Sequence, residues 1–363
     1  MSDFRIEKIT NRDGSAGTQI CGVTTFSGTS GIIMPGGPVE YRGGRGRGVV
    51  GGQGWAANIH DMQYIEIATT GNAQDFGDLG IARNSAGGAA SATRGLFAGG
   101  YDPSVNSPYS SGAQTSIEYT TISSNGGAWH FGDLQFKNYG LTGCSDGVTA
   151  VWMGGRPNDS WSSWPDSMME YSTIASTGNS STFGDIRAGL FYNEATRGAI
   201  ASPTRGILTA GTNQSGGGSP YAGIENTIDY ITIQTKGDTK EFGELAQSTF
   251  AAGGASSPTR GIVSGGTSPT GTGTGNRTDT IQYITIATLG NAIDFGNLLA
   301  ASRLIDAVSS HTRAVMCGGN TGSDVNVIQY VTIATTGNAV DFGDMVNVGS
   351  NGCSFSDCHG GIV

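Results

Sequence analysis

From residue 47 onward, short apolar segments alternate with glycine-rich turns. A typical segment is the β-branched stretch Tyr230-Ile231-Thr232-Ile233, which leads to a Gly-Asp pair and then to a second short segment containing Phe242-Gly243. β-Branched and aromatic residues favour strands, and a Gly-Asn or Gly-Asp pair suits a type II′ turn, whose first central residue has a positive φ. The pattern therefore predicts β-hairpins and an all-β fold.

The same hairpin occurs six times at a constant spacing. In each copy a Tyr is followed by a Phe twelve positions later, an Ile stands three positions after the Tyr, and a Gly stands seven positions after it. The pairs are Tyr64 and Phe76, Tyr119 and Phe131, Tyr171 and Phe183, Tyr230 and Phe242, Tyr283 and Phe295, and Tyr330 and Phe342. Because one inserted residue would turn the following side chains to the opposite face, the constant interval indicates one structural unit repeated six times.

A second motif follows the Phe of each unit. It combines Thr-Arg-Gly, an apolar stretch and a double glycine, as in Thr93-Arg94-Gly95-Leu96-Phe97-Ala98-Gly99-Gly100, and it recurs around Thr149, Arg205, Arg260, Arg313 and Gly360. Each unit therefore contains a small-residue strand, an apolar strand, a Tyr strand and a Phe strand. Repeats of about 40 to 50 residues with four strands are typical of propeller blades. We expect residues 47–363 to form a six-bladed β-propeller with four antiparallel strands in each blade.

The two ends of the repeat region suggest how such a ring would close. The apolar strand with its glycines occurs seven times if Arg47-Gly48-Val49-Val50-Gly51-Gly52 and Gly360-Gly361-Ile362-Val363 are both counted, against six hairpins. Our hypothesis is that C-terminal strands near Ser354 to Val363 complete the blade that contains Tyr64 and Phe76. This pairing would hide two strand edges that otherwise invite association with other chains.

Composition narrows the class of protein. Gly accounts for 62 of 363 residues, charged residues for 13%, and the net charge is −10, which fits tight turns between short strands rather than a disordered chain. The balance of charge is acidic and only four Lys are present, whereas phosphate binding needs clustered Lys and Arg, so nucleic acid is not an expected partner. The five cysteines show no CxxC spacing, so we expect reduced thiols. No stretch of about 18 apolar residues occurs, and we expect no membrane insertion.

Motifs for catalysis are missing from the sequence. The histidines His60, His130, His311 and His359 stand at unrelated positions of the repeat, and no GxSxG, HExxH or phosphate-binding loop is present. We therefore expect a protein that is not an enzyme and that has no cofactor and no metal site.

Four arginines, Arg94, Arg205, Arg260 and Arg313, recur at the turn between the first two strands of a unit. A ring of arginines could bind an anion. Alternatively, each arginine could pair with a carboxylate or a carbonyl group and fix the turn or the contact between blades, and this is the interpretation that we favour.

The loops of the predicted blades divide into a uniform and a variable set. In an antiparallel blade, the turns between strands 1 and 2 and between strands 3 and 4 lie on one face, and the other connections lie on the opposite face. The segment from the double glycine to the next Tyr, on that opposite face, varies in length and carries Tyr101, Tyr109, Trp161, Trp164 and Tyr221. Because loops on rigid scaffolds often carry recognition, we predict that these aromatics bind a ligand or partner. The alternatives are that they cover their own loops or contact a neighbouring subunit.

These motifs resemble those of the Kelch family, whose repeat has an Arg-containing first strand, a double glycine after the second, a Tyr in the third and a Trp in the fourth. Gly99-Gly100, Gly154-Gly155, Gly265-Gly266 and Gly318-Gly319 match the double glycine, whereas Phe replaces the Trp in every copy. The resemblance implies a Kelch-like β-propeller that departs from the family at the Trp position.

A second resemblance covers nearly the whole chain. The unit Tyr330-Val331-Thr332-Ile333-Ala334-Thr335-Thr336-Gly337-Asn338-Ala339-Val340-Asp341-Phe342-Gly343-Asp344 and the leader Lys8-Ile9-Thr10-Asn11-Arg12-Asp13-Gly14 are similar to structural proteins of tailed phages that infect marine bacteria. The resemblance implies a location in the virion and a role as a tail-fibre or decoration protein.

The phage resemblance also implies partners. Residues 1–46 lie outside the repeat, and we expect them to be an arm that attaches to other virion proteins or supports a homo-oligomer; a plain flexible terminus is the alternative. A host surface glycan or protein is the expected ligand of the variable loops. The alternative function is a cellular Kelch-type scaffold for protein–protein interaction.

Overall fold

The structure is a computed structural model that describes residues 46–54, 60–105, 112–156, 167–187, 200–209, 211, 224–272 and 275–362. The chain divides into two units, Met1–Tyr41 and Arg42–Val363. The first unit lies outside the described residues, as does nearly all of the predicted arm of residues 1–46. The predicted arm therefore stays a prediction.

The described residues form strands and no helix, as the pattern predicts. The first sheet has the order β23, β1, β2, β3, with bounds Cys353–Ser356, Arg47–Gly51, Asp61–Glu66 and Gln74–Asp78. Its C-terminal strand β23 pairs antiparallel with β1, and Val49 lies opposite Phe355. The C-terminal segment thus pairs with the first repeat, as the surplus copy predicts, but only through residues 353–356; the residues around Gly360 form a turn.

The second sheet has seven strands because one long strand serves two repeats. Its strands are β4 (Gly87–Ala90), β5 (Arg94–Ala98), β6 (Gln114–Thr121), β7 (Trp129–Ser145), β8 (Thr149–Arg156), β9 (Met168–Thr173) and β10 (Ser181–Asp185). Strand β7 pairs with β6 up to Asn138 and with β8 from Tyr139 onward. The Phe strand of the second repeat therefore runs without a break into the small-residue strand of the third.

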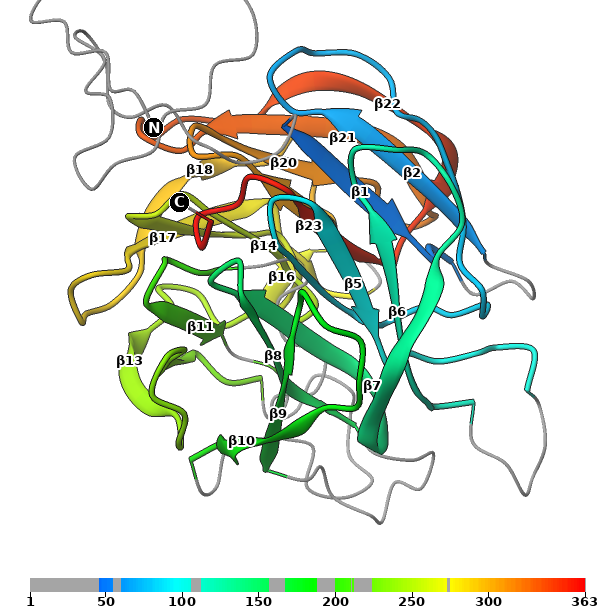
Figure 1. The fold of residues 1–363 in the computed structure, drawn as a ribbon. Helices are drawn as coiled ribbons and strands as arrows, with labels where there is room; N and C mark the ends of the chain where they lie inside the picture. The colour runs from blue at the N-terminus through cyan, green and yellow to red at the C-terminus, as the bar shows by residue number, and fades with distance from the viewer. Residues whose placement is uncertain are drawn as a thin grey trace, which may run out of the picture. The chain divides into compact units, whose positions relative to one another are not determined.

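Three further sheets follow along the chain. They contain β11 (Arg205–Thr209), β12 (Thr227–Thr232) and β13 (Lys240–Glu244); then β14 (Gly253–Ser256), β15 (Arg260–Ser264), β17 (Thr280–Thr285) and β18 (Ile293–Asn297); and last β19 (Asp306–Ser309), β20 (Arg313–Cys317), β21 (Val325–Thr332) and β22 (Val340–Gly349). Strand β16 (Thr267–Thr272) belongs to none of them. Within the second unit the sheets follow one another around a common centre, which is a β-propeller-like arrangement (Figure 1).

The number of sheets differs from the predicted number of blades. The described residues form five sheets, of which four contain four strands or more, rather than six separate four-stranded sheets. The continuous strand β7 joins two repeats into one sheet, and the described residues of the fourth repeat form three strands plus an isolated bridge between Ala201 and Gly206. Counting sheets therefore does not give six blades.

The Tyr and Phe strands pair as a hairpin in all six copies, but the predicted turn is wrong. In the first copy β2 ends at Glu66 and β3 begins at Gln74, and the turn is closed by the Thr69 N–H, which donates to the Glu66 carbonyl at 3.2 Å. The same 3.2 Å bond closes the equivalent turn in the other five copies. The Gly-Asn pair comes two residues after this turn. The N–H of its Gly bonds to another repeat, as described below.

The core lies between neighbouring repeats. One cluster joins Leu96 and Ile117 of the second repeat to Phe131 of the same repeat and to Trp152 and Ile174 of the third. The Tyr and Phe rings of each copy meet edge to face, with centroids 5.8 to 6.3 Å apart. Edge-to-face geometry at this separation is the favoured arrangement of aromatic rings. The constant twelve-residue interval therefore places one aromatic pair in every repeat.

Candidate functional site

The Gly-Asn pair forms a repeated joint between neighbouring repeats. The N–H of each Gly seven positions after the Tyr donates to the carbonyl oxygen of the Phe in the preceding repeat, at 2.7 to 3.0 Å. The donors and acceptors are Gly126 and Phe76, Gly178 and Phe131, Gly237 and Phe183, Gly290 and Phe242, Gly337 and Phe295, and Gly71 and Phe342. The last of these bonds connects the sixth repeat to the first.

A β-bulge explains why the Phe carbonyl is available to this joint. Where the Tyr strand pairs with the Phe strand, the register shifts at the Phe; Met62 lies opposite Gly77, and Gln63 lies opposite Asp75. A bulge leaves one residue out of the ladder. A Cβ on Gly77 would stand 2.5 Å from the Gly126 oxygen, so the close approach of the two repeats requires the Gly after Phe76.

An arginine adds a second link at five of the six junctions. Arg47, Arg94, Arg205, Arg260 and Arg313 each place the guanidinium carbon 4.2 to 4.8 Å from the centre of the Tyr ring in their own repeat. The same side chains donate to carbonyl groups of the next repeat; Arg313, for example, donates to Ile67 and Ala68 of the first repeat at 3.0 and 2.9 Å. The predicted pairing of arginines with carbonyl groups between units is therefore confirmed.

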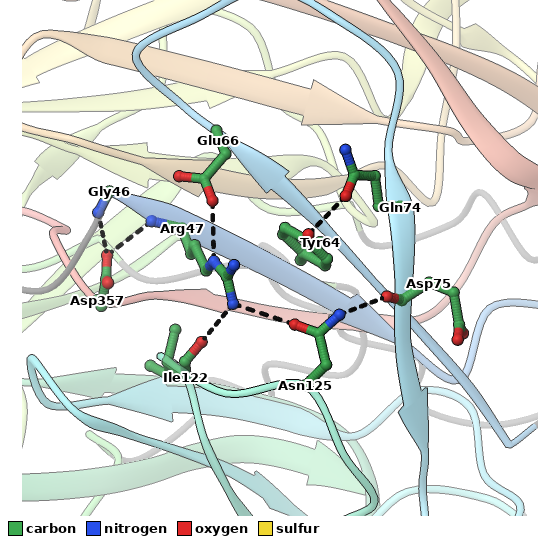
Figure 2. A network of polar contacts seen from close by, with 9 residues as sticks. All are labelled: Gly46, Arg47, Tyr64, Glu66, Gln74, Asp75, Ile122, Asn125 and Asp357. Carbon is green, nitrogen blue, oxygen red and sulfur yellow. Dashed lines mark hydrogen bonds and ion pairs between the residues drawn. The ribbon is translucent and has the colours of Figure 1, made fainter.

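Figure 2 shows this junction between the first and second repeats. Arg47 donates through Nε to Glu66 at 2.9 Å and through Nη1 to the Ile122 carbonyl and the Asn125 side chain, both at 3.2 Å. Asn125 in turn donates to the Asp75 carbonyl at 3.0 Å. On the other side, Asp357 accepts hydrogen bonds from the backbone N–H groups of Gly46 and Arg47. One arginine thus connects the first repeat, the second repeat and the C-terminal segment.

The third repeat lacks this arginine, because Thr149 begins β8 at the equivalent position. Its Tyr171 is covered instead by Lys236 of the fourth repeat, whose ammonium nitrogen lies 3.8 Å from the ring centre. Lys236 also donates to the Tyr171 hydroxyl at 2.5 Å, and this bond lowers the pKa of the phenol. Gln234 of the fourth repeat donates to Asp146 of the third at 3.1 Å.

Residues 357–362 pack against inner strands of several repeats. His359 is fully buried, its Nε2 lies 3.0 Å from Ser145 Oγ and 3.2 Å from the Ala90 oxygen, and its Nδ1 accepts the Gly361 N–H at 3.0 Å. Since Nδ1 is an acceptor, the proton of the neutral ring is on Nε2. Burial lowers the pKa of His359 to about 4. The C-terminal segment therefore carries a neutral histidine between the second and third repeats.

A hollow of about 470 Å³ lies beside this segment, on the face with the turns between strands 1 and 2. It is lined by the turn that contains Ala92, the turn that contains Gly147, Ala175 and Ile362. At the equivalent position the fourth, fifth and sixth repeats have Pro203, Pro258 and His311, and His311 bonds to the Ile362 carbonyl. The hollow follows from the smaller side chains of the second and third repeats.

The predicted recognition residues are placed only in part. Tyr109, Trp161, Trp164 and Tyr221 lie outside the described residues. Tyr101 is half-buried, its backbone pairs with Asn84, and its ring packs 5.4 Å from that of Tyr139 at an angle of 56°. Tyr101 therefore anchors the start of a variable loop, and its predicted role in binding stays a prediction.

Sequence reasoning missed a further link at the residue before each Tyr. This position holds Gln63, Glu118, Glu170, Asp229, Gln282 and Gln329. Four of them accept a backbone N–H from the preceding repeat, as Gln329 does from Leu299 at 2.8 Å. The other two pair with arginines, Glu118 with Arg83 at 3.1 Å and Asp229 with Arg187 at 3.0 Å. An amide or carboxylate before every Tyr was the available signal.

Candidate chemistry in the described residues is sparse. His60 contacts the Leu79 carbonyl, and His130 is exposed 3.9 Å from Asp133. The thiols of Cys144, Cys317 and Cys358 are buried, and burial raises the pKa of each. No group of three or more His, Cys, Asp or Glu that could hold a metal occurs in the part of the chain that the structure describes. The same part contains no helix long and apolar enough to cross a membrane.

No known family model matches the chain, and no curated protein matches it either. The resemblances to Kelch repeats and to phage structural proteins therefore rest on the motifs quoted above.

Proposed function

We propose that the second unit is a six-bladed propeller in which each Tyr–Phe hairpin belongs to one blade. The cycle of Gly-to-Phe hydrogen bonds supports this count, because it passes through six repeats before it returns to the first. Strand β7 would then serve two blades, and residues 200 and 201 would stand in the innermost strand of the fourth blade.

We propose that the chain is a structural protein of a tailed-phage virion and not an enzyme. Its propeller would decorate the particle or tail and would bind the host surface through the variable loops. One observation carries the recognition part of this proposal: the joints between repeats are nearly identical, whereas the segments between the double glycines and the Tyr strands differ from repeat to repeat. A uniform frame that presents unlike loops is the arrangement in which binding usually resides.

The partners follow from the same proposal. Residues 1–46 would attach the propeller to other virion proteins or to further copies of this chain, and the ligand would be a host glycan or protein. Mass spectrometry of purified particles tests the location. The proposal predicts peptides of this chain at a stoichiometry that survives density-gradient purification, and their absence from such particles would contradict it.

Loop substitutions in the full chain test the recognition role. Replacing Trp161 and Trp164 by Ala should lower binding to host cells about tenfold or more, since buried interface aromatics commonly contribute a few kcal/mol. Trp129→Ala is the matched control because Trp129 is 70% exposed on the outer strand β7, next to the uniform turn. Equal losses in the two variants, or no loss in either, would contradict recognition by the variable loops.

A Kelch-type interaction scaffold is the second candidate, and the double glycines favour it. Gly99 and Gly100 have φ angles of +61° and +99°, and Gly265 and Gly266 have +64° and +104°. Residues other than Gly rarely adopt such φ angles, so the backbone at these positions favours the double glycine. Recovery of this chain from host cells with a stable protein partner, and not from particles, would support the scaffold.

A further inference from the structure

The hollow beside the C-terminal segment is lined by two opposite charges. Arg94 of the second repeat and Asp146 of the third both line this space of about 470 Å³, together with the exposed Val148 and Ala175 and the buried Ile362. A space of this size with an apolar lining and a few polar groups is typical of small-molecule sites. The hollow therefore has the size and the lining of a binding site.

The turn that contains Asp146 needs an acceptor but not a charge. Asp146 Oδ1 accepts the N–H groups of Val148 and Thr149 at 3.0 and 2.7 Å. In four other repeats a serine hydroxyl accepts the two equivalent N–H groups. These serines are Ser91, Ser202, Ser257 and Ser310. A hydroxyl therefore closes the turn as well, and the turn does not explain the charge of Asp146.

No cation balances the charge of Asp146 in the described part of the chain. Its Oδ2 accepts from the neutral Gln234 amide at 3.1 Å, and no Lys, Arg or His described by the structure forms an ion pair with it. Asp146 influences the pKa of the buried His359, but that pKa is about 4 and the ring is neutral above it. The Asp146 carboxylate therefore lines the hollow as an unpaired charge.

Arg94 has no carboxylate partner among the described residues either. Its Nη1 donates to the carbonyl groups of Ile174 and Ala175 at 2.9 and 3.1 Å, and its guanidinium group covers the Tyr119 ring. A guanidinium group has further donors at Nε and Nη2. No ion pair within 4.0 Å joins Arg94 to Asp146. Two opposite charges therefore line one hollow without neutralising each other.

We propose that this hollow binds a zwitterionic ligand of the amino-acid type, whose ammonium group bonds to Asp146 and whose carboxylate bonds to Arg94. A ligand with a single charge would meet one like charge in the lining, whereas a zwitterion matches both. The guanidinium group and the carboxylate each form strong hydrogen bonds with a group of opposite charge. Val148, Ala175 and Ile362 contact the carbon chain between the two charged groups of the ligand. The inference uses neither the virion location nor the variable loops.

Binding of amino acids of different length to the purified full chain tests the site. Glycine, 4-aminobutyrate and 6-aminohexanoate are titrated by calorimetry, and the preferred length reports the separation of the two protein charges. The comparison compounds are glucose and the carboxylic acid and the amine of the preferred chain length. We expect saturable binding of at least one amino acid and about tenfold weaker binding of each single-charge compound, since each lacks one charged contact.

Three variants make the result specific. Asp146→Ser keeps the hydroxyl acceptor that four other turns use and removes the carboxylate, so it should weaken binding about tenfold or more. Ala92→His introduces the residue that the sixth repeat has at His311, and its ring should fill the hollow and abolish binding. Asp75→Asn removes a charge from an exposed position on β3 and should bind like the wild type. Ala92→His remains informative if Asp146→Ser fails to fold.

Three results would overturn the proposal. The first is no saturable binding of any of the amino acids by the wild type. The second is binding of glucose or of a single-charge compound as tight as that of the preferred amino acid. The third is equal affinity in Asp146→Ser and Asp75→Asn. Particle composition and host-cell binding are measured independently, so each of these results leaves the virion proposal untouched.

Discussion

The junction between the third and fourth repeats differs from the five others in which repeat supplies the cation over the Tyr ring. At the five regular junctions, an arginine covers the Tyr of its own repeat and donates to the next repeat. At the exceptional one, Thr149 replaces the arginine and Lys236 reaches back from the fourth repeat to cover Tyr171. The cation over the Tyr ring is common to all six junctions, whereas the repeat that supplies it is not.

The two kinds of junction should differ in strength. Arg260 donates to the carbonyl groups of Ile333 and Ala334 at 2.8 and 3.0 Å and also stacks on Tyr283. Lys236 is exposed and bonds only to the Tyr171 hydroxyl among the contacts described. Two hydrogen bonds from a charged group, one of them part-buried, stabilise a protein more than a single exposed polar contact does. We therefore expect the link between the third and fourth repeats to be the weakest of the six cation–Tyr links.

Removing residues 352–363 should lower the stability of the protein more than any other change. The deletion leaves β1 without its neighbour β23 and removes the contacts of Asp357 and His359 with other repeats. We expect loss of the cooperative thermal transition, measured by circular dichroism. A deletion variant that melts like the full chain would contradict the role of the C-terminal strand.

Breaking a regular junction should cost less but still be severe. Arg260→Ala removes the stacking on Tyr283 and leaves two carbonyl groups without their donor, so we expect a loss of about 2 to 4 kcal/mol in the free energy of unfolding. Arg260→Lys should lose less, because the charge remains over the ring. Urea denaturation measures both, and an Arg260→Ala variant within about 0.5 kcal/mol of the wild type would argue against the link.

The contact of the C-terminal segment with the second and third repeats should be sensitive to acid. His359 contacts Ser145 of the third repeat, and burial holds its pKa at about 4, below the 6.5 of a free histidine. Below pH 6.5 the unfolded chain binds a proton that the folded chain does not, so stability falls as the pH is lowered from about 6.5 to about 4. The loss is roughly 2 to 3 kcal/mol.

Two variants isolate this histidine from other titrating groups, including His311 and Asp146, which act on the same ring. His359→Gln should show a smaller loss of stability between pH 6.5 and pH 4 than the wild type. His130→Gln, which changes an exposed histidine, should keep the wild-type slope. Equal slopes in all three proteins would show that His359 does not titrate as described.

The smallest effect concerns Lys236 itself. Lys236→Ala should cost about 0.5 to 1 kcal/mol, as expected for an exposed cation over an aromatic ring. Adding Thr149→Arg to that variant should recover part of the loss, because an arginine there has the position that Arg94 and Arg260 have in their repeats. If the double variant is less stable than Lys236→Ala alone, the equivalence of the junctions is wrong.

The sequence predicts the repeating part of the fold well because its signals are periodic. The twelve-residue interval from Tyr to Phe gives the hairpins, and the surplus C-terminal copy gives the pairing of β23 with β1. The Gly-Asn pair was assigned to a turn because local propensity cannot show that its N–H meets a Phe carbonyl in another repeat. Lys236 was likewise not predictable, since its contact with Tyr171 spans 65 positions of the chain.

The candidate sites divide in the same way, into those with a periodic signal in the sequence and those without one. The arginine links to carbonyl groups were predicted because the arginines recur at one position of the repeat. The contacts of Asn320 with Arg277 and Arg303 were not, because these residues lie in segments without a repeated sequence pattern. The aromatic recognition residues stay predictions, with Tyr101 alone placed by the structure.

Hydrogen exchange of six glycine amides tests the central claim, a closed ring of six repeats. Gly71, Gly126, Gly178, Gly237, Gly290 and Gly337 each donate to a Phe carbonyl of a neighbouring repeat, and for Gly71 that neighbour is at the other end of the chain. The account predicts that the Gly71 amide, observed by NMR, is protected to a degree similar to the other five. Rapid exchange at Gly71 with protection of the other five would contradict the closed ring.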